Sequence, residues 1–155
     1  MNTTDRPLRA LTIWQPWAAA IATGRKNVEN RIWPTRYRGT VAIHAGRTLD
    51  KSALDTTAPL NFQDPLVRRT YTAAPPHLRA LSSIVALAEL TDCHPARRCC
   101  RPWGVVEPDA YHWVLTNIRA LSEPIPCKTG RQRLWIPDPA TLAALATAPL
   151  AQVGA

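Results

Sequence analysis

Three residues near the N-terminus have side chains that could hold or process a nucleotide. Lys26, Glu29 and Arg31 fall within six residues of one another. In an extended chain Glu29 and Arg31 share a face, because side chains two apart point the same way. Gly24 permits the bend that would bring Lys26 beside them. Two cations can hold a phosphate or carbonyl oxygen, and a carboxylate accepts a proton or an amino hydrogen bond. The alternative is an exposed ion-pair cluster worth little, and the spacing leaves both interpretations open.

Arginines alternate with aromatic residues immediately afterwards. Arg31, Arg36 and Arg38 are interleaved with Trp33 and Tyr37. This pattern is typical of surfaces that hold phosphates and stack bases, although the two rings could instead cover the end of a barrel. We expect at least one of the three arginines to face a ligand.

Two further ionisable residues lie within expected strands. His44 falls in the alternating segment 40–45, where a lone histidine is more commonly a hydrogen-bonded structural group than a catalyst. Glu89 interrupts the apolar segment 83–91, and an unpaired carboxylate there would be costly. Glu89 therefore either pairs with Lys26 or Arg31, or marks the exposed end of its strand.

The chain has four cysteines, three of them in one loop. This is a poor framework for disulfides. A zinc site would recruit Cys93, His94, Cys99 and Cys100, while Cys127 lies apart. Each adjacent pair would then have to direct two neighbouring side chains at one metal, whereas structural zinc ligands are usually spaced further apart. The sequence therefore favours reduced thiols with no metal and no cofactor.

The bulk composition fits one globular domain. The chain has 155 residues and a formal net charge of +8, from 19 Lys and Arg against 11 Asp and Glu. This excess attracts phosphate, although abundant arginine can also reflect genome composition. No apolar run approaches the roughly 20 residues of a membrane span, and residues 1–9 lack the apolar stretch of a signal peptide. We expect a cytoplasmic protein with no membrane partner.

Hydrophobic patterning predicts an α+β, mainly β fold, a small and partly open β-barrel with a short early helix and a few peripheral helices. Strands are expected at 9–14, 40–45, 83–91, 111–118 and 132–136. Helices are expected at 16–23 and 139–146, with a helical turn at 50–56. The expected organisation is a flexible N-terminus (1–7), a domain (8–137) with a Pro-rich insertion (58–80, one helix around 66–71), and a C-terminal helix and tail (138–155).

Several of these motifs together resemble the ASCH domain of the PUA-like superfamily. They are residues 11–17, the Gly-x-Lys-x-x-Glu-x-Arg signature at 24–31, and residues 38–45. Residues 111–117 and 124–130, followed by Leu134-Trp135, are similar to the closing strands of that domain. The resemblance runs from about Leu8 to Ile136 and is weakest in the Pro-rich insertion.

The resemblance implies a β-barrel with a basic cleft beside the first helix, and binding of RNA or another nucleic acid. The residues expected to bind the nucleic acid are Gln15, Trp17, Lys26, Glu29, Arg31, Trp33, Arg36, Tyr37, Arg38 and His44. Some members are small enzymes. One group hydrolyses N4-acetylcytidine, with a lysine where Lys26 stands but a threonine in place of Glu29, and others are ribonucleases.

The resulting prediction is a nucleic-acid-binding domain, with RNA favoured over DNA. Crowding by Arg31 would lower the pKa of Lys26 and Glu29 would oppose that shift, which favours Lys26 as a phosphate clamp over a base. The alternative is a hydrolase of RNA or of a modified nucleoside, with Lys26 and Glu29 as the catalytic acid–base pair. A third possibility is an adaptor that engages a protein through the insertion and the loop 93–103.

Overall fold

The computed structural model describes residues 6–57 and 63–152. Parts of the expected flexible N-terminus (1–5), of the Pro-rich insertion (58–62) and of the C-terminal tail (153–155) lie outside the described residues. The strands are β1 (Arg9–Gln15), β2 (Val28–Arg31), β3 (Gly39–Leu49), β4 (Ser83–Pro95), β5 (Tyr111–Pro126), β6 (Leu134–Trp135) and β7 (Leu150–Gln152). The helices are α1 (Trp17–Ala22), α2 (Lys51–Leu54), α3 (Asp64–Ala73), the 3-10 helix η2 (Pro76–Arg79) and α4 (Pro139–Thr147).

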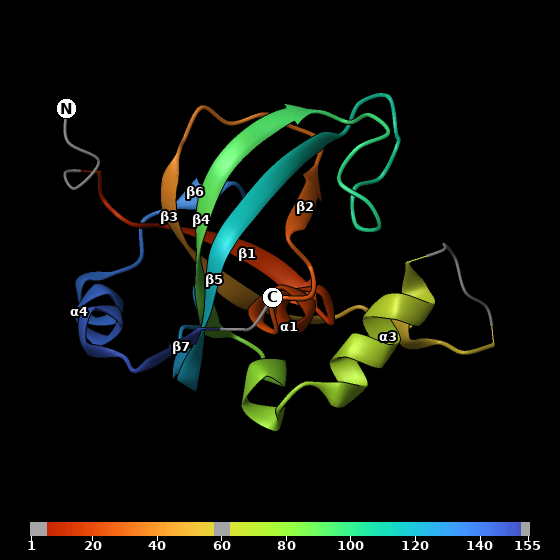
Figure 1. The fold of residues 1–155 in the computed structure, drawn as a ribbon. Helices are drawn as coiled ribbons and strands as arrows, with labels where there is room; N and C mark the ends of the chain where they lie inside the picture. Colours follow the sequence, from red (N-terminus) through yellow and green to blue (C-terminus); the bar gives the residue numbers. More distant parts are fainter. Residues whose placement is uncertain (1–5, 58–62, 153–155) are drawn as a thin grey trace.

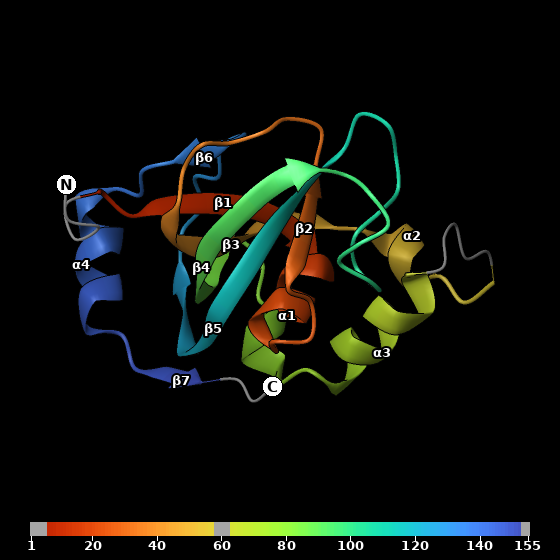
Figure 2. The ribbon, with the colours of Figure 1, turned by 45° about the horizontal axis from the view of Figure 1, so that its top comes forward.

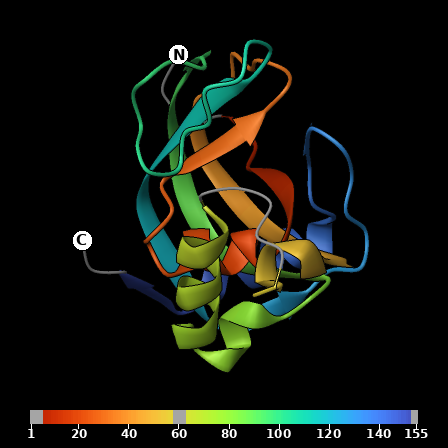
Figure 3. The same ribbon diagram turned by 90° about the vertical axis from the view of Figure 1, so that its right-hand side faces the viewer.

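One curled, seven-stranded sheet forms the body of this part of the chain (Figure 1). The strand order is β2-β5-β4-β3-β1-β6, with β7 added beside β5. Strand β1 runs parallel to β3, and the other pairs are antiparallel. The sheet curls over itself without closing (Figure 3), which confirms the predicted mainly β, partly open barrel.

The core lies inside this curl. Leu11 and Ile13 of β1, Val41 and Ile43 of β3, and Trp113 of β5 are buried in the largest hydrophobic cluster. Their two-residue spacing places them on the same face of each strand. A smaller cluster on the other face of β1 and β3 packs under α4, which lies beside that side of the sheet (Figure 1).

Helix α1 lies across the end of the barrel, next to the start of β2 (Figure 2). Its residues Ala18 to Ala22 are all buried. Packing therefore stabilises this helix, which is too short to be stable in isolation. Gly24, with φ of 78°, ends the helix in the left-handed conformation that glycine adopts readily. The chain then enters β2, which sets Lys26 and Glu29 at the helix end.

Several elements are longer than expected. Strand β4 continues to Pro95 and β5 to Pro126, and the pairing of these two strands extends over both lengths. The short strand β7 was not predicted. No helix in the described part of the chain is long and apolar enough to cross a membrane.

Candidate functional site

A buried ion-pair network joins the three residues of the signature. Lys26 is 2% exposed, and its Nζ donates to Glu29 Oε2 and to the Val28 carbonyl, both at 2.5 Å. The second carboxylate oxygen, Glu29 Oε1, lies 3.4 Å from Arg31 Nε. The bend after α1 and the two-residue spacing on β2 therefore bring these side chains together as predicted. The network is buried, which excludes the alternative of an exposed surface cluster.

Arg31 is the member of the network that reaches the surface, with 17% of its side chain exposed. Its Nη2 donates to the Thr12 carbonyl at 2.8 Å, which anchors the guanidinium against β1. The guanidinium lies 5.4 Å from the centroid of the Trp33 ring, and the guanidinium of Arg133 lies at the same distance from that ring. Two arginines and a tryptophan thus form one unit beside Glu29.

One donor of this unit has no acceptor, and a second has only a poorly placed one. Trp33 Nε1 is buried and makes no hydrogen bond. Arg31 Nε is also buried; it lies 3.4 Å from Glu29 Oε1 without the geometry of a hydrogen bond. Buried polar groups without partners are uncommon, and each calls for an explanation. An acceptor brought by a ligand, such as a phosphate or base carbonyl oxygen, would supply what these donors lack.

Burial and charge act in opposite senses on the pair. Burial lowers the pKa of Lys26, and it outweighs the opposing attraction of Glu29; the charge of Arg31 also lowers this pKa. Arg31 and Glu29 act on this pKa in the opposite directions expected from the sequence, but burial, which was not considered there, has the largest effect. Burial raises the pKa of Glu29, yet the charges of Lys26 and Arg31 prevail and hold it below its usual value. Glu29 is thus a carboxylate at neutral pH, lying between Lys26 and Arg31.

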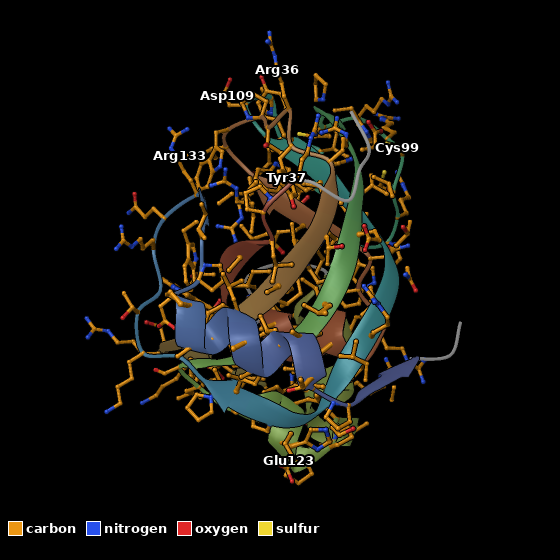
Figure 4. All side chains as sticks on the ribbon, turned by 90° about the vertical axis from the view of Figure 1, so that its left-hand side faces the viewer. Arg36, Tyr37, Cys99, Asp109, Glu123 and Arg133 are labelled. Carbon is orange, nitrogen blue, oxygen red and sulfur yellow. The ribbon has the colours of Figure 1, made fainter. Side chains whose placement is uncertain are left out.

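In the segment after β2, some side chains are exposed to solvent and others are hydrogen-bonded to the protein. Arg36 is exposed and extends away from the molecule, whereas Tyr37 folds back over the sheet (Figure 4). The Tyr37 hydroxyl donates to the Thr40 carbonyl at 2.7 Å. Arg38 Nη1 donates to the carbonyls of Thr35 and Tyr37, so Arg38 mainly fastens its own turn. Arg36 is the freest cation of this segment.

Gln15 and Trp17 stabilise the fold around α1. Gln15 is fully buried; its Oε1 accepts from the Ala19 amide at 2.9 Å, and its Nε2 donates to the carbonyls of Leu78 and Ala80. Trp17 packs between two core clusters and donates from Nε1 to Asp50 at 3.3 Å. Both residues therefore tie α1 to neighbouring elements instead of facing the Lys26 network.

His44 lies on the face of β3 opposite the barrel core. Its Nδ1 is 3.1 Å from Thr12 Oγ1, which in turn accepts from Trp135 Nε1 at 3.0 Å. Its Nε2 is 2.6 Å from the Cys127 carbonyl, so this nitrogen carries the proton. Burial lowers the pKa of His44, with the Cys127 hydrogen bond opposing. A neutral, doubly hydrogen-bonded His44 joins β1, β3 and β6, separate from the Lys26 network.

Glu89 pairs with neither Lys26 nor Arg31. Its Oε1 accepts from Thr40 Oγ1 at 2.7 Å and from Arg119 Nη2 at 3.3 Å. The side chain is half-buried rather than at an exposed strand end. A second carboxylate is therefore not brought to Lys26 by β4.

Two cavities lie away from the Lys26 network. The larger, about 920 Å³, lies between α3, η2, β5 and the loop containing Trp103, with Arg25, Arg69 and His77 in its lining. The other, about 460 Å³, lies along α3. Neither is lined by Lys26, Glu29 or Arg31, so the surface at this network is not one of these hollows.

Sequence reasoning missed three partners of the network. Arg133 comes from the segment before β6, about a hundred residues after Trp33. Asn30 donates to the Trp103 carbonyl at 2.9 Å and accepts from the Val105 amide at 3.0 Å. Trp103 Nε1 donates to the Arg25 carbonyl at 2.7 Å. No local spacing signals these contacts, because each joins segments distant in sequence.

Of the four zinc ligands considered from the sequence, His94, Cys99 and Cys100 lie together in the structure and Cys93 does not. The Cys93 side chain accepts from the Thr35 amide and packs against the core. His112 of β5 joins His94, Cys99 and Cys100 in its place. His112, the residue of this group most distant in sequence from the others, was not considered as a ligand from the sequence.

Comparisons with known proteins agree with this fold. A family model described as the ASCH domain matches residues 11–125. The structure is similar to the crystal structure of ASCH from Zymomonas mobilis, with a TM-score of 0.55 and 16% identity over 94% of this chain and 98% of that chain. A mutant of the Zymomonas mobilis protein matches with the same TM-score and identity, over 93% of this chain and 100% of that chain. No curated protein matches the chain significantly.

Proposed function

The chain belongs to the ASCH domain family, whose members are generally RNA-binding or hydrolase-like. We propose that this protein binds RNA through the surface around Arg31, Trp33 and Arg133. Exposed Arg36 extends this surface. We define these four residues as the arginine–tryptophan surface. Lys26 and Glu29 lie beneath it.

The observation that carries the proposal is the way Arg31 is held. Glu29 lies on one side of its guanidinium, the Thr12 carbonyl accepts from Nη2, and the Trp33 ring lies beside it. A guanidinium fixed in this way loses little freedom on binding an oxyanion. Trp33 Nε1 has no acceptor, and Arg31 Nε has only Glu29 Oε1 at 3.4 Å, so both donors favour a ligand rich in acceptors. Phosphate and base oxygens provide such acceptors.

Trp33 supplies the aromatic component of the surface. Stacking of a base on an aromatic ring contributes about 1–3 kcal/mol in single-stranded complexes. The guanidinium of Arg133, an exposed residue, lies over this ring. In the proposed complex Arg133 moves from the ring to a phosphate, and a base replaces it on Trp33.

Lys26 then has a supporting role and is not the phosphate clamp. Two of its three donors are used by Val28 and Glu29, and the side chain is almost fully buried. Lys26 fixes Glu29, and Glu29 fixes Arg31. The positions of Gln15, Trp17 and His44 favour scaffold roles for these three residues.

The hydrolase alternative rests on the lowered pKa of Lys26, which would make this amine a better base or nucleophile than an exposed lysine. Two observations weigh against it. Glu29 is held as an anion by two cations, so it is a poor proton donor. Glu89, the other carboxylate considered, is engaged by Arg119 and Thr40. Binding without cleavage is therefore the function that the geometry supports best.

The test is a pair of gels on labelled single-stranded RNA, one native and one denaturing, over a series of KCl concentrations. We expect a shifted but intact RNA, with affinity falling steeply as salt rises. Arg36→Ala and Arg133→Ala should each weaken binding several-fold. Each should also reduce the slope of log affinity against log salt by about 0.7 per lost phosphate contact.

Lys51→Ala is the matched control, because Lys51 is an exposed cation on α2, outside the arginine–tryptophan surface. It should leave both affinity and slope unchanged. Equal losses in all three variants would indicate nonspecific attraction by net charge and contradict the proposed surface. Shortened RNA that depends on Lys26 would instead establish the hydrolase. Tighter binding of a DNA strand of the same sequence would contradict the preference for RNA.

A further inference from the structure

A second polar cluster lies at the end of the sheet where β4 leads into the loop 96–110. The ligand atoms of His94, Cys99, Cys100 and His112 all lie within 4.8 Å of one another. His94 Nε2 is 3.1 Å from Cys99 Sγ and 3.6 Å from Cys100 Sγ, and Cys99 Sγ is 3.6 Å from His112 Nδ1. The two sulfurs are 3.1 Å apart. Figure 4 shows Cys99 at the same end of the molecule as Arg36 and Tyr37.

These separations suit a tetrahedral metal. Zn–S bonds of about 2.3 Å and Zn–N bonds of about 2.0–2.1 Å place the ligand atoms of a tetrahedron about 3.3 to 3.8 Å apart. Four of the six pairs of ligand atoms are 3.1 to 3.6 Å apart and need an expansion of at most about 0.7 Å, the largest at the sulfur pair. The other two pairs lie within 4.8 Å. Two thiolates with two imidazoles are the donor set of a structural zinc site, and four protein ligands close it.

Strand register brings the two histidines together. His94 on β4 is the direct partner of His112 on β5, and their ring centroids are 5.3 Å apart. Cys93, one residue earlier, points to the opposite face of the sheet because strand side chains alternate. The histidine pair therefore belongs to the rigid sheet, and the cysteine pair belongs to the loop.

Each histidine is oriented by a partner on its other ring nitrogen. His94 Nδ1 donates to Asp92 Oδ2 at 2.8 Å. His112 Nε2 is 2.7 Å from the Val105 carbonyl, which can only accept, so Nε2 carries the proton. The nitrogens with free lone pairs, Nε2 of His94 and Nδ1 of His112, are the ones that face the thiols. Such partners are the usual outer ligands that orient metal-binding imidazoles.

The loop backbone is shaped around this cluster. Cys100 has φ of 62°, an uncommon conformation for a residue with a side chain, and in it the neighbouring thiols of Cys99 and Cys100 face the same point. A Cβ added to Gly104 would lie 2.7 Å from His112 Cε1 and 3.0 Å from Cys100 Cβ. The position therefore admits glycine alone. The strained cysteine and the required glycine indicate a built site, since such features persist where surroundings enforce them.

We propose that His94 Nε2, Cys99 Sγ, Cys100 Sγ and His112 Nδ1 bind one Zn²⁺ ion in a closed site that fastens the loop 96–110 to β4 and β5. The ion replaces the two thiol protons, which are released to solvent, and the two thiolates balance its charge. The loop so fastened carries Trp103, whose Nε1 donates to the Arg25 carbonyl. Asn30 contacts the same loop at Trp103 and Val105.

The test measures metal bound to the purified full chain under reducing conditions. We expect about one zinc per chain by elemental analysis. After removal of the metal by a chelator, titration with Co²⁺ should give the intense visible bands of a tetrahedral site and the near-ultraviolet thiolate-to-cobalt band. Added Zn²⁺ should abolish both. The double variant Cys99→Ser/Cys100→Ser should lose the thiolate band and the stoichiometric zinc.

Cys93→Ser is the matched control, because Cys93 is next to His94 in the sequence but its side chain lies outside the cluster. It should retain zinc and the cobalt spectrum. Asp92→Asn keeps all four ligands and should weaken zinc affinity about 10- to 100-fold in competition with a chromophoric chelator. This variant keeps the proposal testable if the double variant fails to fold.

Three outcomes would overturn the proposal. The first is a wild-type protein that takes up neither Zn²⁺ nor Co²⁺ with its thiols reduced. The second is a Cys99–Cys100 disulfide that persists in the native protein and excludes metal. The third is a cobalt spectrum that Cys93→Ser abolishes and the double variant leaves intact.

Discussion

At the scale of single residues, the central feature is a carboxylate enclosed by two cations. Glu29 accepts from Lys26 and lies beside Arg31, in surroundings from which water is largely excluded. Such a group is not a strong source of stability when compared with apolar residues, but removal of one partner leaves an uncompensated buried charge. The three residues should therefore behave as one unit under mutation.

This coupling predicts the outcome of a double-mutant cycle. Lys26→Met and Glu29→Gln should each lower the free energy of unfolding by about 3–5 kcal/mol. The double variant should lose clearly less than the sum, because no unpaired Lys26 or Glu29 charge remains buried. Urea unfolding followed by circular dichroism measures all four proteins.

The pair Glu89 and Arg119 provides the matched control. The two side chains are in contact at 3.3 Å but are 30% and 25% exposed, so Glu89→Gln and Arg119→Met should couple by about 0–1 kcal/mol. A coupling of Lys26 with Glu29 no larger than this would show that burial does not strengthen the pair. The supporting role given to Lys26 would then be wrong.

At the scale of elements, His44 connects strands that are distant in sequence. The chain of hydrogen bonds from Trp135 through Thr12 and His44 to Cys127 joins β6, β1, β3 and the segment after β5. Protonation of His44 would break it, because Nδ1 would then carry a proton facing a hydroxyl that already needs an acceptor. The connection should therefore depend on pH.

The direction of this dependence follows from the pKa. Burial holds the pKa of folded His44 below its unfolded value of about 6.5. The stability from neutral His44 is complete above that value and is lost as pH falls towards the folded pKa, at up to about 1.4 kcal/mol per pH unit. Unfolding measured between pH 7 and pH 5 should show a smaller loss in His44→Asn than in wild type.

Thr12→Val is the informative control for this measurement. It removes the hydroxyl but leaves His44 buried, and burial is the main cause of the lowered pKa. Thr12→Val should therefore be less stable than wild type and keep most of the wild-type slope, losing only the part that the Thr12–His44 hydrogen bond contributes. A His44→Asn protein with the wild-type slope would show that other groups control acid unfolding.

The elements also show what could be predicted from the sequence. The apolar run 83–91 correctly predicted the buried part of β4, because burial on both faces leaves a continuous apolar pattern. The rest of β4, to Pro95, has polar residues, and its strand conformation comes from pairing with β5. Strand β7, three residues long, is too short to produce a pattern.

The candidate site divides in the same way. Lys26, Glu29 and Arg31 could be predicted as neighbours, because one bend and one strand decide their positions. Arg133 over Trp33 and His112 beside His94 could not, because strand register and a later loop decide these contacts. Gln15 and His44 belong to the family-like motifs, yet their hydrogen bonds are to the scaffold.

At the scale of the whole molecule, the loop 96–110 links the two proposed sites. At one end, Cys99 and Cys100 meet the histidines of β4 and β5. Further along, Trp103 is buried against the α1 side of the structure. It contacts the residues on either side of Lys26 and Glu29, namely Arg25 and Asn30. A metal that fixes the loop would therefore also fix the end of α1 and the start of β2.

Removal of the metal should accordingly loosen the molecule in a defined pattern. Amide exchange measured with and without a zinc chelator should become faster in the loop 96–110 and in residues 25–31, because these segments hold each other. Amides in β1 and β3 should keep their protection, since their pairing does not involve the loop. Local opening of this kind appears on the timescale of hydrogen exchange.

Faster exchange confined to the loop would show that Trp103 and Asn30 hold the Lys26 network without the metal. A uniform change would indicate global unfolding. Restoration of protection by added Zn²⁺ in both segments would show that metal binding in the loop also stabilises the segment that holds Arg31.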